Sequence, residues 1–156
     1  MTDSGTRTDR SGEHGDAGSR HEDVSRPLVS AVITTYERPA YLREAVQSVL
    51  DQTYTPLELV VVDDHSETPA RRVLAGMDLS DLADVRCVRH EENRGANAAR
   101  NSGIEASSGE YVAFLDDDDR WKPSKTARQV ETFRESDGDV GVVYTGVEKV
   151  SETDAY

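Results

Sequence analysis

Apolar runs alternate with amphipathic segments along most of this chain. The runs are rich in valine, isoleucine and leucine and carry turn residues at their ends, which is typical of buried strands. Between them, apolar residues recur at the three- and four-residue spacing of a helix that covers a core. The pattern predicts strands over residues 27–36, 56–64, 85–89, 111–115 and 140–144, and helices over 39–50, 69–77, 96–106 and 125–134.

This order of elements predicts an α/β fold. Strands that alternate with helices form a mostly parallel open sheet with right-handed crossovers and helices on both faces. Nearly continuous apolar strands, such as 56–62, fit a sheet that is covered on both sides. No Gly-x-Gly-x-x-Gly follows the first strand and no Gly-Lys-Ser/Thr is present, which disfavours a Rossmann dinucleotide site and a P-loop.

The first 26 residues differ in composition from the rest. They are almost entirely Asp, Ser, Gly, Thr, Arg and His, so we predict a disordered polar tail over 1–26 and one folded domain over 27–156. No secretory apolar segment is visible at the N-terminus. No apolar run approaches the roughly 20 residues of a membrane helix, so no membrane-spanning segment is expected.

Charge narrows the classes of partner. The chain has 31 acidic and 18 basic residues and a formal net charge of −13. This balance argues against nucleic acid and anionic membranes as direct partners and suggests adaptation to high salt, where screening removes self-repulsion. The single cysteine, Cys87, excludes an internal disulfide and a multi-cysteine zinc site, and we expect it to be a buried strand residue.

Residues 109–123, GEYVAFLDDDDRWKP, contain the most distinctive motif. A buried strand here ends in four aspartates, 116–119. Ligands bind outside the carboxyl ends of strands in open α/β sheets, and clustered carboxylates repel one another unless a cation lies between them. In extended chain Asp116 and Asp118 share one face, so they can hold a hard divalent cation such as Mg²⁺. On these residues alone, a solvated acidic turn is an equally good interpretation.

Two other strands end in polar residues. The second strand ends in Asp63 and Asp64, which would lie at the same sheet edge as the four aspartates. The first strand ends in Thr34 and Tyr36, which could bond and stack on a base; a helix cap with a packed tyrosine is the alternative.

Two arginines follow the third strand. Arg94 and Arg100 are suited to bidentate contact with phosphate. The alternative is that one of them neutralises the aspartates as a structural pair, and for Arg100 this alternative is favoured if its helix face is buried.

Together these motifs resemble the nucleotide-sugar-binding half of family 2 glycosyltransferases, which are inverting enzymes of the GT-A (nucleotide-diphospho-sugar transferase) fold. The resemblance runs from about residue 28 to 144 and rests on four segments in this order: VSAVITTYERPAYLREAVQSVLDQTY, LELVVVDDHS, NRGANAARNSGI and GEYVAFLDDDDRWKPSK. One departure is His65, which stands where the family commonly has a small residue.

The resemblance implies site residues. Thr34 and Tyr36 line the nucleoside pocket, Asp63 and Asp64 bind the base, and the remaining nucleotide-sugar contacts are Arg94 or Arg100, Asp116 and Asp117. Asp116 and Asp118 match the family's Asp-x-Asp and hold the metal, Mn²⁺ or Mg²⁺, which bridges the diphosphate. The donor is a UDP- or GDP-linked sugar.

The resemblance also predicts what lies outside the motifs. The family's general base and acceptor site belong to a C-terminal half, and among the 37 residues after Asp119 we nominate no base. The chain therefore corresponds to a donor-binding half without the acceptor half, and the alternative to an enzyme is a non-catalytic nucleotide-sugar and metal-binding module. Many relatives act on lipid-linked glycans at the cytoplasmic membrane face, which implies a cytoplasmic or peripheral location. A haloacid-dehalogenase-type phosphotransferase is disfavoured because Arg120 and Trp121 follow the aspartates.

Overall fold

A computed structural model describes residues 26–136 and 138–149 of the chain. In this part the elements are β1 (Val29–Thr35), α1 (Pro39–Leu50), β2 (Leu57–Asp63), α2 (Ala70–Leu74), β3 (Asp84–Arg89), α3 (Ala96–Ala106), β4 (Tyr111–Asp116) and α4 (Lys125–Glu135). The strands form one parallel sheet in the order β3-β2-β1-β4. The predicted fold class is confirmed.

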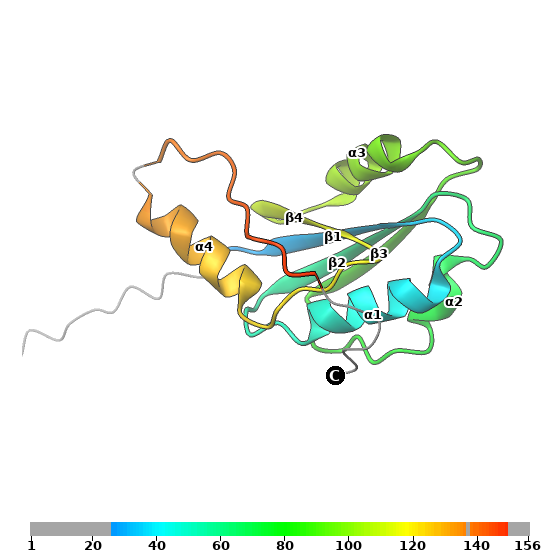
Figure 1. The fold of residues 1–156 in the computed structure, drawn as a ribbon, viewed down its shortest axis with the longest axis horizontal. Coiled ribbons are helices and arrows are strands. Elements are labelled where there is room, and N and C mark those ends of the chain that lie inside the picture. The colour runs from blue at the N-terminus through cyan, green and yellow to red at the C-terminus, as the bar shows by residue number, and fades with distance from the viewer. Residues whose placement is uncertain (1–25, 137, 150–156) are drawn as a thin grey trace, which may run out of the picture.

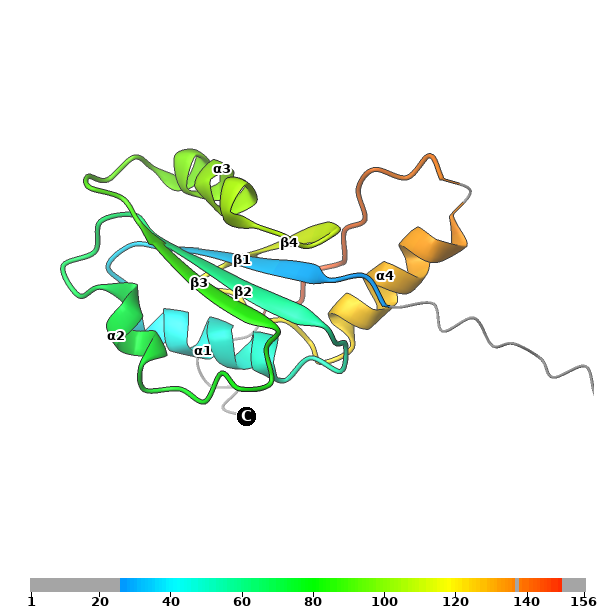
Figure 2. The same ribbon diagram turned by 180° about the vertical axis from the view of Figure 1, so that it is seen from behind.

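Helices cover both faces of the sheet. α1 and α2 lie on one face and α3 on the other (Figures 1 and 2). The larger core lies between the sheet and α1, where side chains such as Ile33, Val46 and Val61 are fully buried. Val130 of α4 joins this core, and Phe133 of α4 stacks on Tyr111 at the start of β4 with ring centroids 4.7 Å apart.

The α3 face is narrower and more tightly packed. Ala99 of α3 packs against Val32, Val60 and Val62 of the two central strands. Gly103, one turn further on, lies so close to the sheet that a Cβ atom built on it would be 2.3 Å from Cγ1 of Val32. Glycine is therefore required at 103 for this approach.

A buried glutamate ties the loop between α3 and β4 to the amino ends of the strands. Glu58 of β2 is fully buried and accepts hydrogen bonds from Ser30 Oγ, Ser108 N and Ser108 Oγ, each at 2.5 Å, and from Gly109 N at 3.1 Å. Burial alone would raise the pKa of this carboxyl, but these donors outweigh burial and hold the pKa below its usual range. The charge is thus stabilised by the loop that it anchors.

Strand register brings the carboxyl ends together. Thr35 of β1 lies opposite Asp63 of β2, and Thr34 lies opposite Asp116 of β4. Arg89 closes β3 opposite Asp63. The polar ends of all four strands of the described sheet therefore share one edge, as the motif argument requires.

Two predictions about elements are wrong. Residues 140–144 form no strand but an irregular segment in which Tyr144 is 90% exposed, and this segment pairs with none of the four strands of the described sheet. The helix predicted over 69–77 is limited to Ala70–Leu74. Cys87 is half-buried on β3, and burial raises the pKa of its thiol.

Two further expectations concern the ends and the membrane. The tail predicted over 1–26 lies, apart from residue 26, outside the described residues. Among residues 26–136 and 138–149, no helix is both long and apolar enough to cross a bilayer.

Candidate functional site

The candidate site lies at the carboxyl ends of the strands. We call it the acidic edge and define it as Asp63 and Asp64 at the end of β2 and Asp116 to Asp119 at the end of β4. β1 lies between these strands, so its end and the following loop face both acidic groups. β1, β2 and β4 are largely apolar, apart from Ser30 and Glu58 near their starts, and each ends in a polar residue at this edge, where open α/β sheets bind ligands.

Asp117 is the buried anchor of the β4 end. Its Oδ2 accepts a hydrogen bond from Thr35 Oγ1 at 2.7 Å, and its Oδ1 lies 3.3 Å from Nη1 of Arg38. The same Nη1 donates to Oδ2 of Asp118 at 2.8 Å. Arg38, which immediately precedes α1, therefore joins the ends of β1 and β4.

Like Asp119, Asp116 and Asp118 are accessible carboxylates. Both side chains are about half exposed, whereas Asp117 is buried. The chain reaches this arrangement through a turn closed by a 3.0 Å hydrogen bond from Asp119 N to Asp116 O. Nη2 of Arg100 on α3 donates to Asp116 at 2.7 Å, so the structural pairing that was the alternative for Arg100 is present.

Negative charge at this turn is only partly offset. Burial, and then the neighbouring charges of Asp118 and Asp116, raise the pKa of Asp119. A divalent cation would relieve this repulsion, and carboxylate oxygens are the donors that Mg²⁺ and Mn²⁺ prefer. The described residues contain no group of three or more His, Cys, Asp or Glu side chains arranged around a common metal position. One or two carboxylates are enough where a substrate diphosphate supplies further oxygens, so Asp116 and Asp118 fit the ion.

Asp63 holds the loop after β2. Its carboxylate is buried and accepts hydrogen bonds from Ser66 N at 2.8 Å, Ala70 N at 2.9 Å and Arg89 Nη1 at 2.8 Å. These donors include the first residue of α2. In this structure Asp63 therefore fixes where α2 begins.

Asp64 holds the loop before α3. Its Oδ1 accepts from Arg94 N at 2.9 Å and lies 2.6 Å from Nδ1 of His90, while Oδ2 accepts from Gly95 N at 2.7 Å. Nε2 of His90 lies 2.9 Å from Ser102 Oγ on α3, so a hydrogen-bonded chain runs from the carboxylate to the helix. Burial would raise the pKa of Asp64, but the N–H groups of Arg94, His90 and Gly95 together lower it. The base-binding role of Asp63 and Asp64 stays a prediction.

The loops at this edge contain strained backbone. His65 has φ of 75° and Glu37 has φ of 56°, in the left-handed region that non-glycine residues rarely adopt. Ser66 Oγ accepts a hydrogen bond from Glu37 N at 2.9 Å, which links the two loops. Such strain clusters at ligand sites.

The other predicted residues lie at the same edge. Thr34 is half-buried at the end of β1, Tyr36 is 47% exposed, and Arg94 is exposed before α3. Sequence reasoning missed Arg38, Arg89 and His90. Arg38 follows a strand end as closely as Arg94 does, so the same criterion would have found it.

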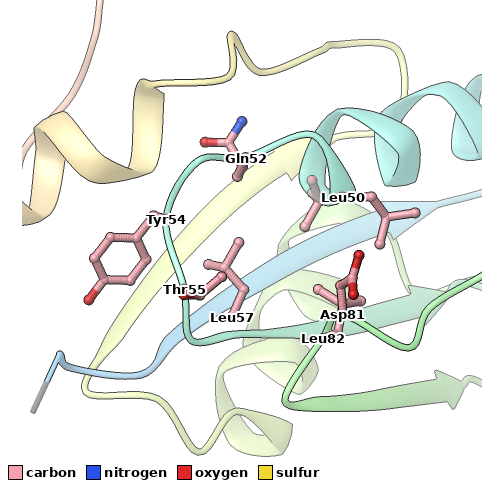
Figure 3. A pocket seen from close by; sticks show the side chains of 8 residues that line it. Leu50, Gln52, Tyr54, Thr55, Leu57, Asp81 and Leu82 are labelled. Carbon is pink, nitrogen blue, oxygen red and sulfur yellow. The ribbon is translucent and has the colours of Figure 1, made fainter.

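A shallow hollow elsewhere is not part of this site. It is lined by residues that include Leu50, Tyr54, Leu57 and Asp81 (Figure 3). Leu57 opens β2, whereas Asp63 closes it, so the hollow lies at the opposite end of the sheet from the acidic edge.

With this geometry established, comparison with known families is decisive. Residues 30–155 match the family described as glycosyl transferase family 2. The chain belongs to this family. The recognition made from the four sequence segments is therefore confirmed.

Curated relatives of this family 2 chain are glycosyltransferases by name. TuaG of Bacillus subtilis, named for teichuronic acid biosynthesis, is 41% identical over 110 residues, which is 70% of this chain and 43% of TuaG. The glucosyl-dolichyl phosphate glucuronosyltransferase of Haloferax volcanii is 40% identical over 116 residues, 73% of this chain and 36% of that protein. The chain thus spans less than half the length of these relatives.

Solved structures of similar fold contain nucleotide sugars. Staphylococcus aureus TarS in complex with UDP-GlcNAc superimposes with a TM-score of 0.63 at 25% identity, over 69% of this chain and 31% of TarS. The mannosyltransferase PcManGT of Pyrobaculum calidifontis, in complex with GDP-Man and Mn²⁺, has a TM-score of 0.62 at 27% identity, over 73% of this chain and 34% of its own. The GT-A fold is therefore confirmed.

Proposed function

We propose that this chain is the nucleotide-sugar-binding part of a metal-assisted, inverting glycosyltransferase. The observation that carries the proposal is the shared edge at which Asp116 and Asp118 are exposed beside the ends of β1 and β2. Family membership and the nucleotide sugars bound by TarS and PcManGT support it. The donor is a UDP- or GDP-linked sugar.

The nucleoside would lie over the ends of β1 and β2. Tyr36 is exposed enough to stack on a base, and Thr34 is half-buried two residues earlier, in β1. Asp64 retains acceptor capacity on Oδ2, which takes one hydrogen bond, from Gly95 N, whereas Oδ1 is engaged by two groups. The imide N–H of uracil or the amide N–H of guanine would donate the second hydrogen bond to Oδ2 of Asp64.

The diphosphate and metal would lie over β4. Asp116 and Asp118 would hold Mn²⁺ or Mg²⁺, with Asp117 fixing the turn from below. When bound, the cation supplies Lewis-acid stabilisation of the negative charge that develops on the leaving nucleoside diphosphate. A cation between the aspartates and the phosphates also explains how so acidic a chain can bind an anionic donor.

We place the acceptor site and its general base in the parts of the relatives that this chain does not match, which make up more than half of each relative's length. Sugar transfer with inversion needs that base to deprotonate the acceptor hydroxyl. Lipid-linked glycans are among the candidate acceptors. If the chain binds donor and metal without turnover, it is a nucleotide-sugar-binding module rather than an enzyme.

Calorimetric titration of UDP, and separately of GDP, tests the proposal. The titrations are run with and without Mn²⁺ in roughly molar salt, which screens the net charge. We expect one nucleotide to bind only with Mn²⁺, and Asp118→Ala to weaken that binding at least about tenfold, the loss of one charge-assisted contact. Asp81→Ala, which removes an exposed carboxylate from the far end of the sheet, is the matched control.

Two results would count against the proposal. If folded parent protein binds neither nucleotide with Mn²⁺, the donor site is not where we place it. If Asp118→Ala binds as tightly as the parent, Asp118 is not a metal ligand. Hydrolysis or transfer from a UDP- or GDP-sugar then distinguishes an enzyme from a binding module.

A further inference from the structure

Arg38 contacts Asp118, the residue that we propose as a metal ligand. Its guanidinium is half exposed and contacts two adjacent carboxylates, Asp117 and Asp118. These two contacts differ in environment, since the Asp117 side chain is 7% exposed and the Asp118 side chain 51%. Arg38 therefore has one buried anchor and one contact that solvent and other ions can reach.

Of the two contacts of Arg38, the one with Asp118 is more easily displaced by another cation. An ion pair between exposed side chains is worth little in water and less in salt. A divalent cation on the Asp118 carboxylate would compete with the guanidinium for the same oxygens. The contact with Asp117 would remain, because Thr35 Oγ1 holds that carboxylate in place at 2.7 Å and it is shielded from solvent.

We propose that Arg38 is a ligand of the donor's diphosphate that rests on Asp117 and Asp118 until a divalent cation takes its place on Asp118. The inference rests on the proposed function and adds a residue to it. Tethered to Asp117, the displaced guanidinium stays beside the cation, where the phosphate oxygens would be. Its planar donors suit phosphate, and it is the arginine that contacts Asp117 and Asp118 of the turn after β4.

Arg100 does not offer the same exchange. Its guanidinium pairs with one carboxylate, the half-exposed Asp116, and otherwise lies 3.4 Å from Asn97 Oδ1 on its own helix. It has no buried carboxylate to hold it at the turn if the cation displaces it. Arg38 is therefore the arginine whose position is coupled to the metal.

The proposal predicts effects of opposite sign on the two ligands. Replacing Arg38 by methionine removes a competitor, so Mn²⁺ alone should bind about two- to fivefold more tightly, as expected for an exposed ion pair. The same change removes a charged phosphate donor, so UDP or GDP in saturating Mn²⁺ should bind about tenfold more weakly or worse. Arg38→Lys should recover part of the nucleotide affinity.

Mn²⁺ binding is measured by the loss of the free-ion signal in electron paramagnetic resonance, and nucleotide binding by calorimetry. Arg128→Met is the charge-matched control, because Arg128 is exposed on α4, which packs at the opposite end of β4. It should leave both affinities within twofold of the parent. Circular dichroism establishes that each variant is folded.

The possible results test the phosphate contact, the exchange on Asp118 and the proposed function separately. If Arg38→Met binds nucleotide with Mn²⁺ as tightly as the parent, Arg38 is no phosphate ligand and the inference is overturned. If Mn²⁺ alone binds Arg38→Met no more tightly than the parent, the exchange on Asp118 does not occur. If the parent itself binds neither nucleotide with Mn²⁺, the proposed function fails first and the inference falls with it.

Discussion

The buried carboxylate of Glu58 offers the sharpest test of how this fold is held together. Replacing Glu58 by leucine keeps the space filled but removes both carboxylate oxygens that accept hydrogen bonds there. Ser108 N–H then loses its partner at the amino end of the sheet, while Gly109 N–H keeps a 2.9 Å bond to Ser30 Oγ. The Ser30 and Ser108 hydroxyls also lose the acceptor that orients them.

The expected cost follows from these contacts. A buried donor left without a partner costs about 1–3 kcal/mol, and Glu58→Leu takes the carboxylate acceptor from Ser108 N–H and from the hydroxyls of Ser30 and Ser108. We therefore expect Glu58→Leu to lower the free energy of unfolding by about 3–5 kcal/mol, a large part of the roughly 5–15 kcal/mol typical of a domain. Glu58→Gln, which keeps one acceptor oxygen but loses the charge, should cost about 1–3 kcal/mol.

Urea denaturation followed by circular dichroism measures these losses. With an m-value of about 2 kcal/mol per molar, the midpoint of Glu58→Leu should fall by about 2 M. Glu105→Leu, on the exposed surface of α3, is the matched control and should change stability by no more than about 0.5 kcal/mol. A loss below about 1 kcal/mol for Glu58→Leu would refute the view that this carboxylate anchors the loop.

The same residue predicts a pH dependence. Because the hydrogen bonds hold the folded-state pKa of Glu58 below its unfolded value, its contribution is complete above the unfolded pKa of about 4.3 and is lost as pH falls through the folded pKa. Stability of the parent should therefore fall more steeply below about pH 4 than that of Glu58→Gln. Parallel curves for the two proteins would contradict the assigned shift.

Three further predictions concern single positions. Gly103→Val should destabilise the fold by at least about 1–3 kcal/mol in urea melts, because its Cβ would overlap Val32; an unchanged midpoint would show that α3 can move away. His65→Gly should stabilise by about 1 kcal/mol by relieving its positive φ, and destabilisation would mean that the 3.4 Å contact of His65 Nδ1 with His90 O outweighs the strain. Burial lowers the pKa of Lys125 to about 8, so NMR titration of its amine should have a midpoint far below that of an exposed lysine; a midpoint above about 10 would mean that the Trp121 ring, 3.6 Å from Nζ, stabilises the charged form more than burial penalises it.

Much of the architecture was predictable because burial leaves a direct pattern in the sequence. The four paired strands are apolar runs such as 57–62, and turn residues or acids mark their ends. The segment 140–144 has the same β-branched composition, but composition reports only propensity. A strand also needs a pairing partner, and this segment pairs with none of the strands of the described sheet.

The site was predictable in composition more than in contacts. Acids at strand ends indicated the edge, and the order of the motifs indicated the family. The partners of each acid were not visible, because they come from distant segments: Arg38 is 79 residues from Asp117, and His90 is 26 residues from Asp64. Asp63 is an example, since its acceptance of hydrogen bonds from Ser66 N and Ala70 N was not visible in the sequence, while its role as a ligand contact stays a prediction.

The close approach of α3 to the sheet sets how this edge can respond to a ligand. With Ala99 buried and Gly103 in contact with Val32, sliding or tilting of α3 would force backbone against side chain. The positions of Arg100 and Ser102 relative to the strand ends are therefore fixed. Accommodation of a donor is left to rotamers such as that of Arg38 and to the two strained loops. Because α3 is already fixed against the sheet, little conformational entropy is lost there when a ligand binds.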